Sequence, residues 1–335
     1  MTKIKSGILA ATAVLLLAAC SSTTETNSTE ATDTRPLIAT TVAPITSIAA
    51  SIAGDRARIE GIVPEGTNSH TFEPSPQIAK LLSDADLILV NGLKLEDPTI
   101  KMAESNKKET TEIVEIGTLV LPEADYLYDF SFPEEEGKPN PHLWTDPSYA
   151  IKYAGVIRDQ LSELDPENAD YYSENFTKFE KLATELSDAL TADQETVPAG
   201  NLKLLTYHDA YAYFAKNYGW TVIGAIQPND FADPAPAEVA RLIDQVKAEN
   251  VTTIFGSEVF PSAVLEEVGR ATGARYEDTL RDDDLPGAPG DAEHSWLGLM
   301  KYNYRTMISG LGGTPTQLDA IVLTPTSSNS VVYPQ

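Results

Sequence analysis

The sequence predicts an α/β protein in which a long helix joins two lobes. Three observations support this prediction. Short apolar strands alternate with helical segments from Pro36 onward, the alternation resumes after Pro198, and a long helical stretch lies between the two halves. Such alternation is typical of mainly parallel sheets covered by helices. With 335 residues, 42% of them hydrophobic, the chain can build a sizeable core.

The first half carries three predicted strands, at 37–42, 59–63 and 86–90, and helices at 45–53 and 77–83. The third strand, Asp86-Leu87-Ile88-Leu89-Val90, is nearly continuously apolar, as expected of a strand buried on both faces. Residues 122–141 interrupt the alternation with Glu134-Glu135-Glu136 and several prolines. We expect an exposed loop there, followed by a helix at 147–164.

The linking helix is predicted over 166–193, between a first lobe of 36–165 and a second lobe of 194–335. One apolar stripe supports it, because the following residues recur at gaps of 3, 3, 4 and 4: Phe176, Phe179, Leu182, Leu186 and Leu190. A helix over 166–192 spans about 40 Å, longer than one small lobe requires.

The second half repeats the alternation. Strands are predicted at 202–206, 220–226 and 251–255, and helices at 210–218, 236–249, 262–272 and 296–311. The final stretch, 315–335, contains the apolar run Ala320-Ile321-Val322-Leu323. We expect this tail to add an edge strand or to cover one.

The first nineteen residues read as a secretory signal peptide. Lys3 and Lys5 form a positive start, and residues 8–19 are uncharged but too few to span a bilayer comfortably. The single cysteine ends the run Leu17-Ala18-Ala19-Cys20, which resembles a bacterial lipobox. The resemblance implies cleavage before Cys20 and a lipid on its sulfur. The alternative is a stray or buried cysteine in an ordinary signal peptide.

Residues 20–35 are predicted to form a lipidated, disordered tether, because they are rich in Ser, Thr and Glu and lack large apolar side chains. The folded part would then lie near the outer face of the bacterial cell membrane. Cleavage removes two lysines and no acid, so the net charge falls from −26 to −28.

Composition excludes several classes of function. An excess of 50 acidic over 24 basic residues argues against nucleic-acid binding, which needs clustered Lys and Arg. One cysteine cannot form an intrachain disulfide or a multi-cysteine zinc site. Only the N-terminal segment is apolar enough to concern a membrane, so a protein with several spanning helices is excluded.

Three of the four histidines lie in loops or at element boundaries. His70 follows a predicted strand, His142 precedes a predicted helix, and His208 follows the strand at 202–206. Neutral imidazole is the commonest nitrogen ligand of metals in proteins, so a metal site is one hypothesis. The spacing alone is weak, and capping or surface histidines remain the alternative.

The surrounding segments resemble those of the metal-binding lipoproteins of bacterial zinc and manganese ABC importers. The resembling runs follow the family's order over nearly all of 36–312: Gly66–Pro76, Val90-Asn91-Gly92 with Glu96, His142–Pro147, His208–Phe214, Ala232–Val251 and Trp296–Asn303. This resemblance implies two lobes, each a mainly parallel four-stranded sheet wrapped by helices, joined by one rigid helix.

The resemblance also implies a ligand set. His70, His142 and His208 match the first three metal ligands of the family. The fourth is a carboxylate in a segment after the last strand of the second lobe, here Ala274–Leu280, where Asp278 is the matching position. Glu277 and Asp282 are near competitors. A solvated acid in an acidic loop is the alternative for Asp278.

Three imidazoles and one carboxylate can close a tetrahedral site, which suits binding, whereas catalytic zinc keeps a position open for water. Nitrogen-rich ligation favours Zn²⁺, and manganese favours harder oxygen donors. The family's manganese-selective members typically carry Glu where this chain has His208. Against zinc, the loop at 122–141 has no histidine-rich run. We therefore expect Zn²⁺, with Mn²⁺ as the alternative.

The expected function is capture of metal in the cleft between the lobes and its delivery to the cognate ABC permease in the membrane. The protein is expected to act as a monomer, lipid-anchored outside the cytoplasm, and not as an enzyme. The chain has no GxxxxGK[ST] loop of its own. The alternatives are a metal-dependent surface adhesin and, with less support, a zinc hydrolase or a passive zinc store.

Metal-bound histidines usually donate their second ring N–H to an oxygen acceptor. Asp146, Asp209, Glu73 and Glu258 are near enough in the sequence to be such acceptors, although helix capping or solvation would explain each equally well. His294 matches no ligand position, and we expect it to be exposed.

Overall fold

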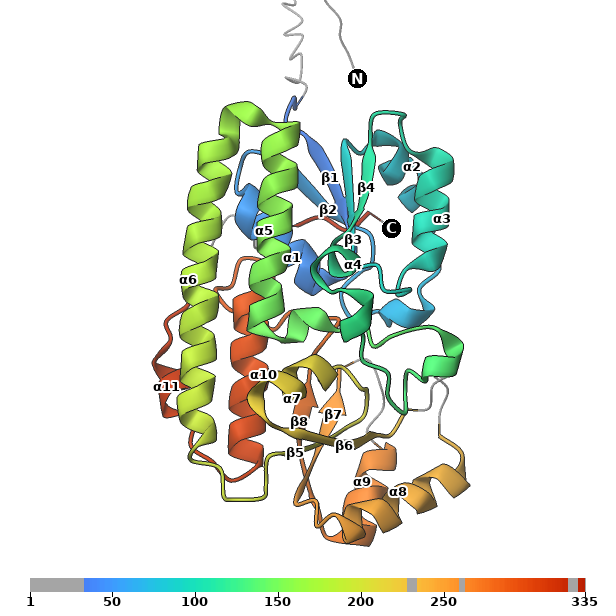
Figure 1. The fold of residues 1–335 in the computed structure, drawn as a ribbon, viewed down its shortest axis with the longest axis vertical. Coiled ribbons are helices and arrows are strands. Elements are labelled where there is room, and N and C mark those ends of the chain that lie inside the picture. The colour runs from blue at the N-terminus through green and yellow to red at the C-terminus, as the bar shows by residue number, and fades with distance from the viewer. Residues whose placement is uncertain (1–32, 228–233, 259–262, 325–330, 335) are drawn as a thin grey trace, which may run out of the picture. The chain divides into compact units, whose positions relative to one another are not determined.

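Two four-stranded parallel sheets form the framework of the structure, which is a computed structural model (Figure 1). It describes residues 33–227, 234–258, 263–324 and 331–334. Both sheets belong to one compact unit, residues 35–335. The predicted signal peptide and Cys20 lie outside the described residues, as does nearly all of the predicted tether. The α/β fold class with two sheets, predicted from the sequence, is confirmed.

The first sheet has the strand order β2-β1-β3-β4. Its strands are β1 (Leu37–Thr40), β2 (Arg58–Gly61), β3 (Leu87–Val90) and β4 (Glu112–Glu115), and its helices are α1 (Ala43–Ala53), α2 (Pro76–Asp84), α3 (Asp97–Asn106) and α4 (Ile116–Val120). The central strands β1 and β3 are buried throughout, as their apolar sequences predict. The pattern did not predict the edge strand β4, because its sequence Glu-Ile-Val-Glu has charged ends and no continuous apolar run.

The second sheet has the order β6-β5-β7-β8. Its strands are β5 (Lys203–Thr206), β6 (Thr221–Ala225), β7 (Thr253–Ser257) and β8 (Arg275–Leu280), and its helices are α7 (Ala212–Tyr218), α8 (Pro236–Ala248) and α9 (Ala263–Thr272). The prediction that 274–280 follow the last strand is wrong, because these residues largely make up the last strand. The edge position of β8 explains the miss, since an edge strand tolerates the charged sequence Arg-Tyr-Glu-Asp.

The long helix is α6 (Ala169–Gln194), which packs along α5 (Pro147–Leu164) and also contacts α1, α10 (Trp296–Gly310) and α11 (Thr316–Ala320) (Figure 1). Within the predicted apolar stripe, Phe179, Leu186 and Leu190 are buried. Short 3₁₀ turns occur at Ser69–Thr71, Glu123–Asp125, Glu134–Glu136, Leu143–Thr145 and Pro166–Asn168. No helix among the described residues has the length and apolarity needed to cross a membrane.

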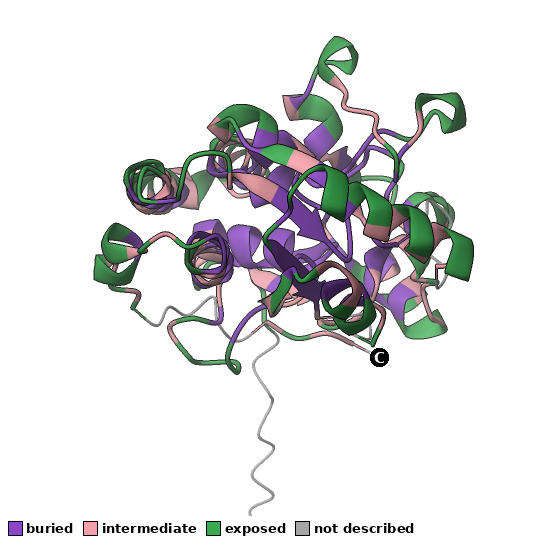
Figure 2. Ribbon diagram, turned by 90° about the horizontal axis from the view of Figure 1, so that it is seen from below, coloured by how far each residue is buried: buried purple, intermediate pink, exposed green. Residues whose placement is uncertain are grey.

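One hydrophobic core runs through both halves, from Leu37 in β1 to Leu318 in α11, and a smaller cluster lies under α8 and α9. The strands are buried inside, whereas the helices expose their outer faces (Figure 2). Buried aromatic side chains tie α10 to the segment before α5: Trp296 Nε1 donates to the Trp144 carbonyl at 2.8 Å, and Tyr304 donates to the Thr145 carbonyl at 2.7 Å. These bonds fix the chain next to His142.

The C-terminal tail reaches an edge strand, but not through the apolar run that the sequence suggested. Residues 321–324 form no strand. Instead, Val332 forms a parallel bridge with Glu60 of the edge strand β2, and the Gly61 N–H donates to the Val332 carbonyl at 2.9 Å.

Candidate metal site

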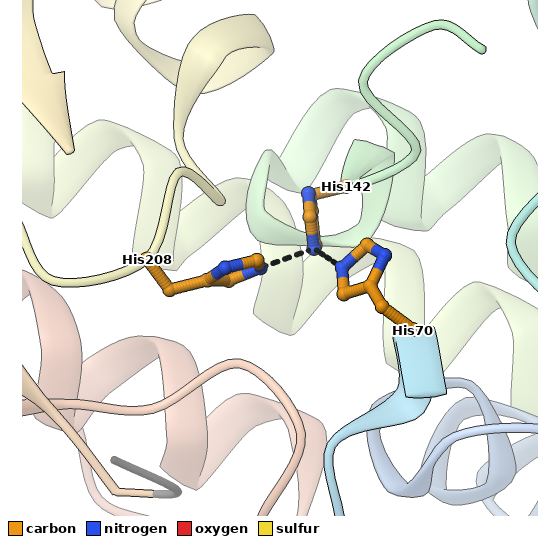
Figure 3. A group of neighbouring side chains, drawn as sticks. All are labelled: His70, His142 and His208. Atoms are coloured by element: carbon orange, nitrogen blue, oxygen red, sulfur yellow. Dashed lines mark hydrogen bonds between the residues drawn. The ribbon is translucent and has the colours of Figure 1, made fainter. Parts of the chain in front are cut away.

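Three histidines from separate parts of the chain converge on one point (Figure 3). His70 lies in the 3₁₀ turn Ser69–Thr71 after β2, His142 directly precedes the turn Leu143–Thr145, and His208 follows the end of β5. The Nε2 atom of His142 lies 3.1 Å from Nε2 of His70 and 3.0 Å from Nε2 of His208. These are the three histidines expected from the sequence, and the structure brings them together.

Side-chain amides hold two of the three rings. Nδ1 of His142 lies 2.9 Å from Oδ1 of Asn140, and Nδ1 of His208 lies 2.9 Å from Oε1 of Gln227. Because an amide oxygen only accepts hydrogen bonds, each Nδ1 carries the proton in the neutral ring. The lone pairs of both Nε2 atoms therefore point to the common centre, which is the tautomer that a metal requires.

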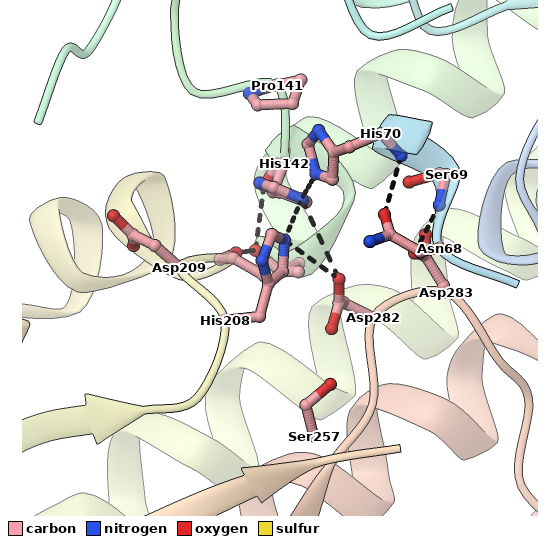
Figure 4. Close-up of polar contacts among 12 residues, drawn as sticks. Asn68, Ser69, His70, Pro141, His142, His208, Asp209, Ser257, Asp282 and Asp283 are labelled. Atoms are coloured by element: carbon pink, nitrogen blue, oxygen red, sulfur yellow. Dashed lines mark hydrogen bonds and ion pairs between the residues drawn. The ribbon is translucent and has the colours of Figure 1, made fainter. Parts of the chain in front are cut away.

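A carboxylate lies beside two of the three histidines. The Oδ2 atom of Asp282 lies 3.6 Å from Nε2 of His208 and 3.9 Å from Nε2 of His142 (Figure 4). This oxygen is buried and has no hydrogen-bond partner among the described residues. Glu258 fixes the backbone here, since its Oε1 accepts the N–H groups of Asp282 at 2.8 Å and Asp283 at 2.9 Å. A buried oxygen without a donor among the described residues, next to the Nε2 lone pairs of His142 and His208, is suited to a cation.

The three acids considered for the fourth ligand lie at different places in the structure. Asp278 lies within β8, and its side chain is outside what the structure describes. Glu277, the first competitor, pairs with Arg275 at 3.0 Å. Asp282, the second competitor, is the acid beside the histidines. The physical reason is the extent of β8: sites in such folds form beyond the carboxyl ends of strands, and β8 ends only at Leu280.

The loop at 122–141, expected to be exposed, instead covers the site in part. Phe132 is buried, and its ring centroid lies 5.6 Å from that of His70 and 5.7 Å from that of His142. Asn140 is also buried and donates from Nδ2 to Asp129 and to the carbonyl of Asp209. The acidic turn Glu134–Glu136 of the same loop remains exposed. The loop thus shields two of the imidazoles from water.

Burial sets the protonation of the site. It lowers the pKa of His70 and of His142 well below the usual value, and the neighbouring His208 adds to both shifts. Burial likewise lowers the pKa of His208 to about 4, despite the opposing bond to Gln227. The pKa of Asp282 is raised by burial and by the nearby Glu258 and Asp283 carboxyl groups. The imidazoles are therefore neutral at pH 7, and a cation would be needed to stabilise the carboxylate beside them.

The four acids suggested as acceptors for the histidines have other contacts. Glu258 binds the backbone at Asp282, Asp146 caps α5 by accepting the Ser148 N–H, and Glu73 is exposed. Asp209 is buried, and among the described residues its carboxylate makes no hydrogen bond to an imidazole. The acceptors observed, Asn140 and Gln227, were missed. A weak signal existed for Asn140, which precedes His142 by two residues, but Gln227 joins His208 only through the pairing of β5 with β6.

The prediction that His294 is exposed was wrong. The residue is buried, and its Nε2 lies 3.2 Å from Oε1 of Glu65. The segment around it, Gly290-Asp291-Ala292-Glu293-His294-Ser295, is polar and so read as surface. The hydrogen bond to Glu65 raises the pKa of His294, although burial opposes the shift.

This raised pKa predicts a pH-dependent contribution to stability. Charged His294 favours the folded state at pH values below its unfolded pKa, about 6.5, and the contribution is lost as the pH rises through the raised folded value. We expect His294→Gln to lower the free energy of unfolding by roughly 1 kcal/mol more near pH 5.5 than near pH 9. Urea denaturation of the metal-free protein measures this difference, and equal losses at both pH values would contradict the ion pair.

Comparison with known proteins agrees with this geometry. Residues 38–310 match the family described as "Zinc-uptake complex component A periplasmic". The manganese-binding lipoprotein MntA of Halalkalibacterium halodurans is 29% identical, with 82% of this chain and 88% of that protein covered. A metal ABC transporter substrate-binding lipoprotein of Lactococcus lactis is 28% identical, with coverage of 90% and 96%.

A solved structure shares the fold. The periplasmic zinc-binding protein TroA of Treponema pallidum superposes with a TM-score of 0.75 at 22% identity, covering 83% of this chain and 99% of that one. With the family match over most of the chain and a histidine cluster set between two parallel sheets, the assignment follows: the chain belongs to the zinc-uptake complex component A family, the metal-binding, extracytoplasmic components of ABC importers.

Proposed function

We propose that this protein captures a divalent metal ion with His70, His142, His208 and Asp282 and hands it to a membrane permease. The ion is its cargo. The observation that carries the ligand assignment is the close approach of the imidazole nitrogens. Two nitrogens whose protons are both on the opposite side of the ring repel each other at 3.0 Å, unless a cation lies between their lone pairs.

The spacing fits a tetrahedral ion. Zinc bonds to histidine nitrogen at about 2.0–2.1 Å, so two ligand atoms on a tetrahedral zinc are about 3.4 Å apart. The nitrogen pairs at 3.0 and 3.1 Å and the carboxylate oxygen at 3.6 and 3.9 Å bracket that value. The three ligand nitrogens lie within 4.8 Å of one another, and the Asp282 carboxylate would have to move toward His70 for all four atoms to reach one ion.

We infer that zinc is the physiological metal. Three imidazoles against one carboxylate favour zinc, because manganese prefers a larger share of oxygen ligands. Four protein ligands also leave no position for an attacking water, which supports a binding role over hydrolysis. On one side the site is lined by the apolar ring of Phe132, which faces two of the imidazoles and cannot act as a ligand.

Metal analysis of protein purified without chelators tests this proposal. We expect one zinc ion per chain. Manganese in its place would overturn the choice of metal and leave the site intact. Protein that carries no metal, and binds none when titrated with zinc or manganese, would overturn the site itself.

Anchoring is part of the proposal. We propose that the chain is held to the outer face of the membrane by lipid on Cys20, with residues 21–35 as the tether. The support is the lipobox-like run Leu17-Ala18-Ala19-Cys20 and the lipoprotein relatives. Mass spectrometry of the N-terminal peptide distinguishes a lipid-modified Cys20 from an unmodified one, and the unmodified form would contradict the anchor.

Gln227 should tune the affinity through His208. Replacing it with leucine removes the acceptor of the Nδ1 proton, so the ring loses both its orientation and some basicity. We expect zinc affinity to fall by about 10-fold to 100-fold. Isothermal titration measures the change. The exposed Gln77 of α2 offers a matched control, because Gln77→Leu should leave the affinity unchanged; equal affinities in both variants would contradict the role of Gln227.

A further inference from the structure

The C-terminal segment Val331–Pro334 lies along the first sheet, far in sequence from the strands it touches (Figure 1). Val332 pairs in parallel with Glu60 of β2, and its carbonyl accepts the Gly61 N–H at 2.9 Å. Residues 331–334 also lie outside 38–310, the range that matches the family. The segment therefore lies beyond the part of the chain that matches the family.

Tyr333 fixes the segment to the sheet. Its ring lies directly against Gly61, where a Cβ atom would come within 2.0 Å of the ring, so only glycine leaves room for it. Its hydroxyl hydrogen-bonds the side chains of Glu65 and Thr46. The ring packs against the main hydrophobic core. One side chain thus joins the tail to β2, to α1 and to the segment that follows β2.

That segment, Ile62–Ser69, leads from β2 to His70, and we call it the His70 loop. Its backbone turns at Pro64–Thr67, where the Thr67 N–H donates to the Pro64 carbonyl at 3.2 Å and Gly66 has a φ of 71°. Glu65 sits in this turn and is held twice, by Tyr333 and by His294. At the far end of the loop, the Ser69 N–H donates to Asp283 at 3.0 Å.

The residues that contact Glu65 and Ser69 of this loop all come from the last part of the chain. His294 precedes α10, Asp283 follows the ligand Asp282, and Tyr333 belongs to the tail. The loop carries a metal ligand of the first sheet, so these contacts set where that ligand stands relative to His208 and Asp282 of the second half. A ligand residue whose loop is fixed by contacts with other residues dissociates from an ion more slowly than one on a mobile loop.

We propose that Val331–Pro334 is a strap that positions His70, acting through Tyr333 and Glu65, and that it slows the release of the bound metal. The proposal rests on the metal-binding function proposed above. Tyr333 is a positioning residue, since it touches Glu65 and not the ion. The strap would let this protein retain its cargo until docking on the permease loosens the His70 loop.

Stopped-flow transfer of zinc from the loaded full-length protein to a chromophoric chelator tests the strap. Tyr333→Phe keeps the ring against Gly61 and removes only the hydroxyl, so the fold is retained. We expect zinc to dissociate about twofold to tenfold faster from this variant, and up to about thirtyfold faster after deletion of 331–335. Val332→Ala is the matched control, because the Val332 side chain is 61% exposed and its backbone carries the pairing; its rate should equal that of the wild type.

The outcomes separate the two proposals. Wild-type protein that takes up neither zinc nor manganese would overturn the metal-binding function. Wild-type protein that binds zinc, with Tyr333→Phe and the deletion releasing it at the wild-type rate, would overturn the strap alone. A purely structural tail would lower the melting temperature of the metal-free and loaded forms equally and leave the imidazole NMR signals of His70 in place. We expect those signals to shift in Tyr333→Phe.

Discussion

Replacing His142 with alanine should weaken zinc binding by about 100-fold or more. His142 is the centre of the cluster, because its Nε2 is within 3.1 Å of both other imidazoles. The binding free energy of a structural zinc ion with four ligands is about 10–16 kcal/mol. One ligand therefore contributes several kcal/mol of it. The loss should appear as a higher dissociation constant in isothermal titration at pH 7.5.

The variant also removes a buried ring, so the control must separate binding from folding. Leu161→Ala removes a buried side chain near the far end of α5, about 20 Å along that helix from Pro147. It should lower the stability by about 2–5 kcal/mol and leave zinc affinity unchanged. If His142→Ala bound zinc as tightly as the wild type, the assignment of the site would fail.

The second large effect is expected at Asp282. Asp282→Asn preserves the shape of the side chain and removes its charge, so the site would have no anionic ligand. We expect a loss of about 100-fold in zinc affinity. We also expect the metal-free variant to be at least as stable as the wild type, because the carboxylate oxygen is buried without a hydrogen-bond donor among the described residues. Titration and thermal melting of the same samples measure both.

The same substitution at two neighbouring acids, Asp278 and Asp283, provides the comparison for Asp282→Asn. Asp278→Asn should bind zinc normally, because β8 extends past Asp278 before the chain turns toward the histidines. Asp283→Asn should have a smaller effect than Asp282→Asn, because Asp283 accepts the Ser69 N–H and so acts on the position of His70. A loss of affinity larger in Asp278→Asn or Asp283→Asn than in Asp282→Asn would move the fourth ligand to that residue.

Much of the fold could be predicted from local sequence, for a physical reason. β1 and β3 are central strands buried on both faces, so their sequences are apolar throughout and stand out. α5 was predicted with its observed bounds, because Asp146 caps it and Pro147 begins it. The edge strands β4 and β8 escaped detection, since one face of each tolerates charge and the apolar signal is diluted.

Some residues of the site could likewise be predicted from local sequence, and others could not. The three histidines could be found from the segments that surround them. The proposed ligand Asp282 could not be separated from Asp278 in the sequence, because the choice depends on where β8 ends, which is set by its pairing with β7. Gln227 and His294 depend on contacts between distant elements, namely the β5–β6 pairing and the approach of the Glu65 turn to the start of α10. Nothing local in the sequence encodes such contacts.

The central claim is that one ion is held by His70, His142, His208 and Asp282. The measurement that tests it most directly is a crystal structure of the zinc-loaded protein with diffraction recorded on both sides of the zinc absorption edge. We predict a single strong anomalous peak about 2.0–2.2 Å from the three Nε2 atoms and from a carboxylate oxygen of Asp282. A peak that lacks any one of the three imidazoles, or that Asp278 reaches and Asp282 does not, would contradict the account.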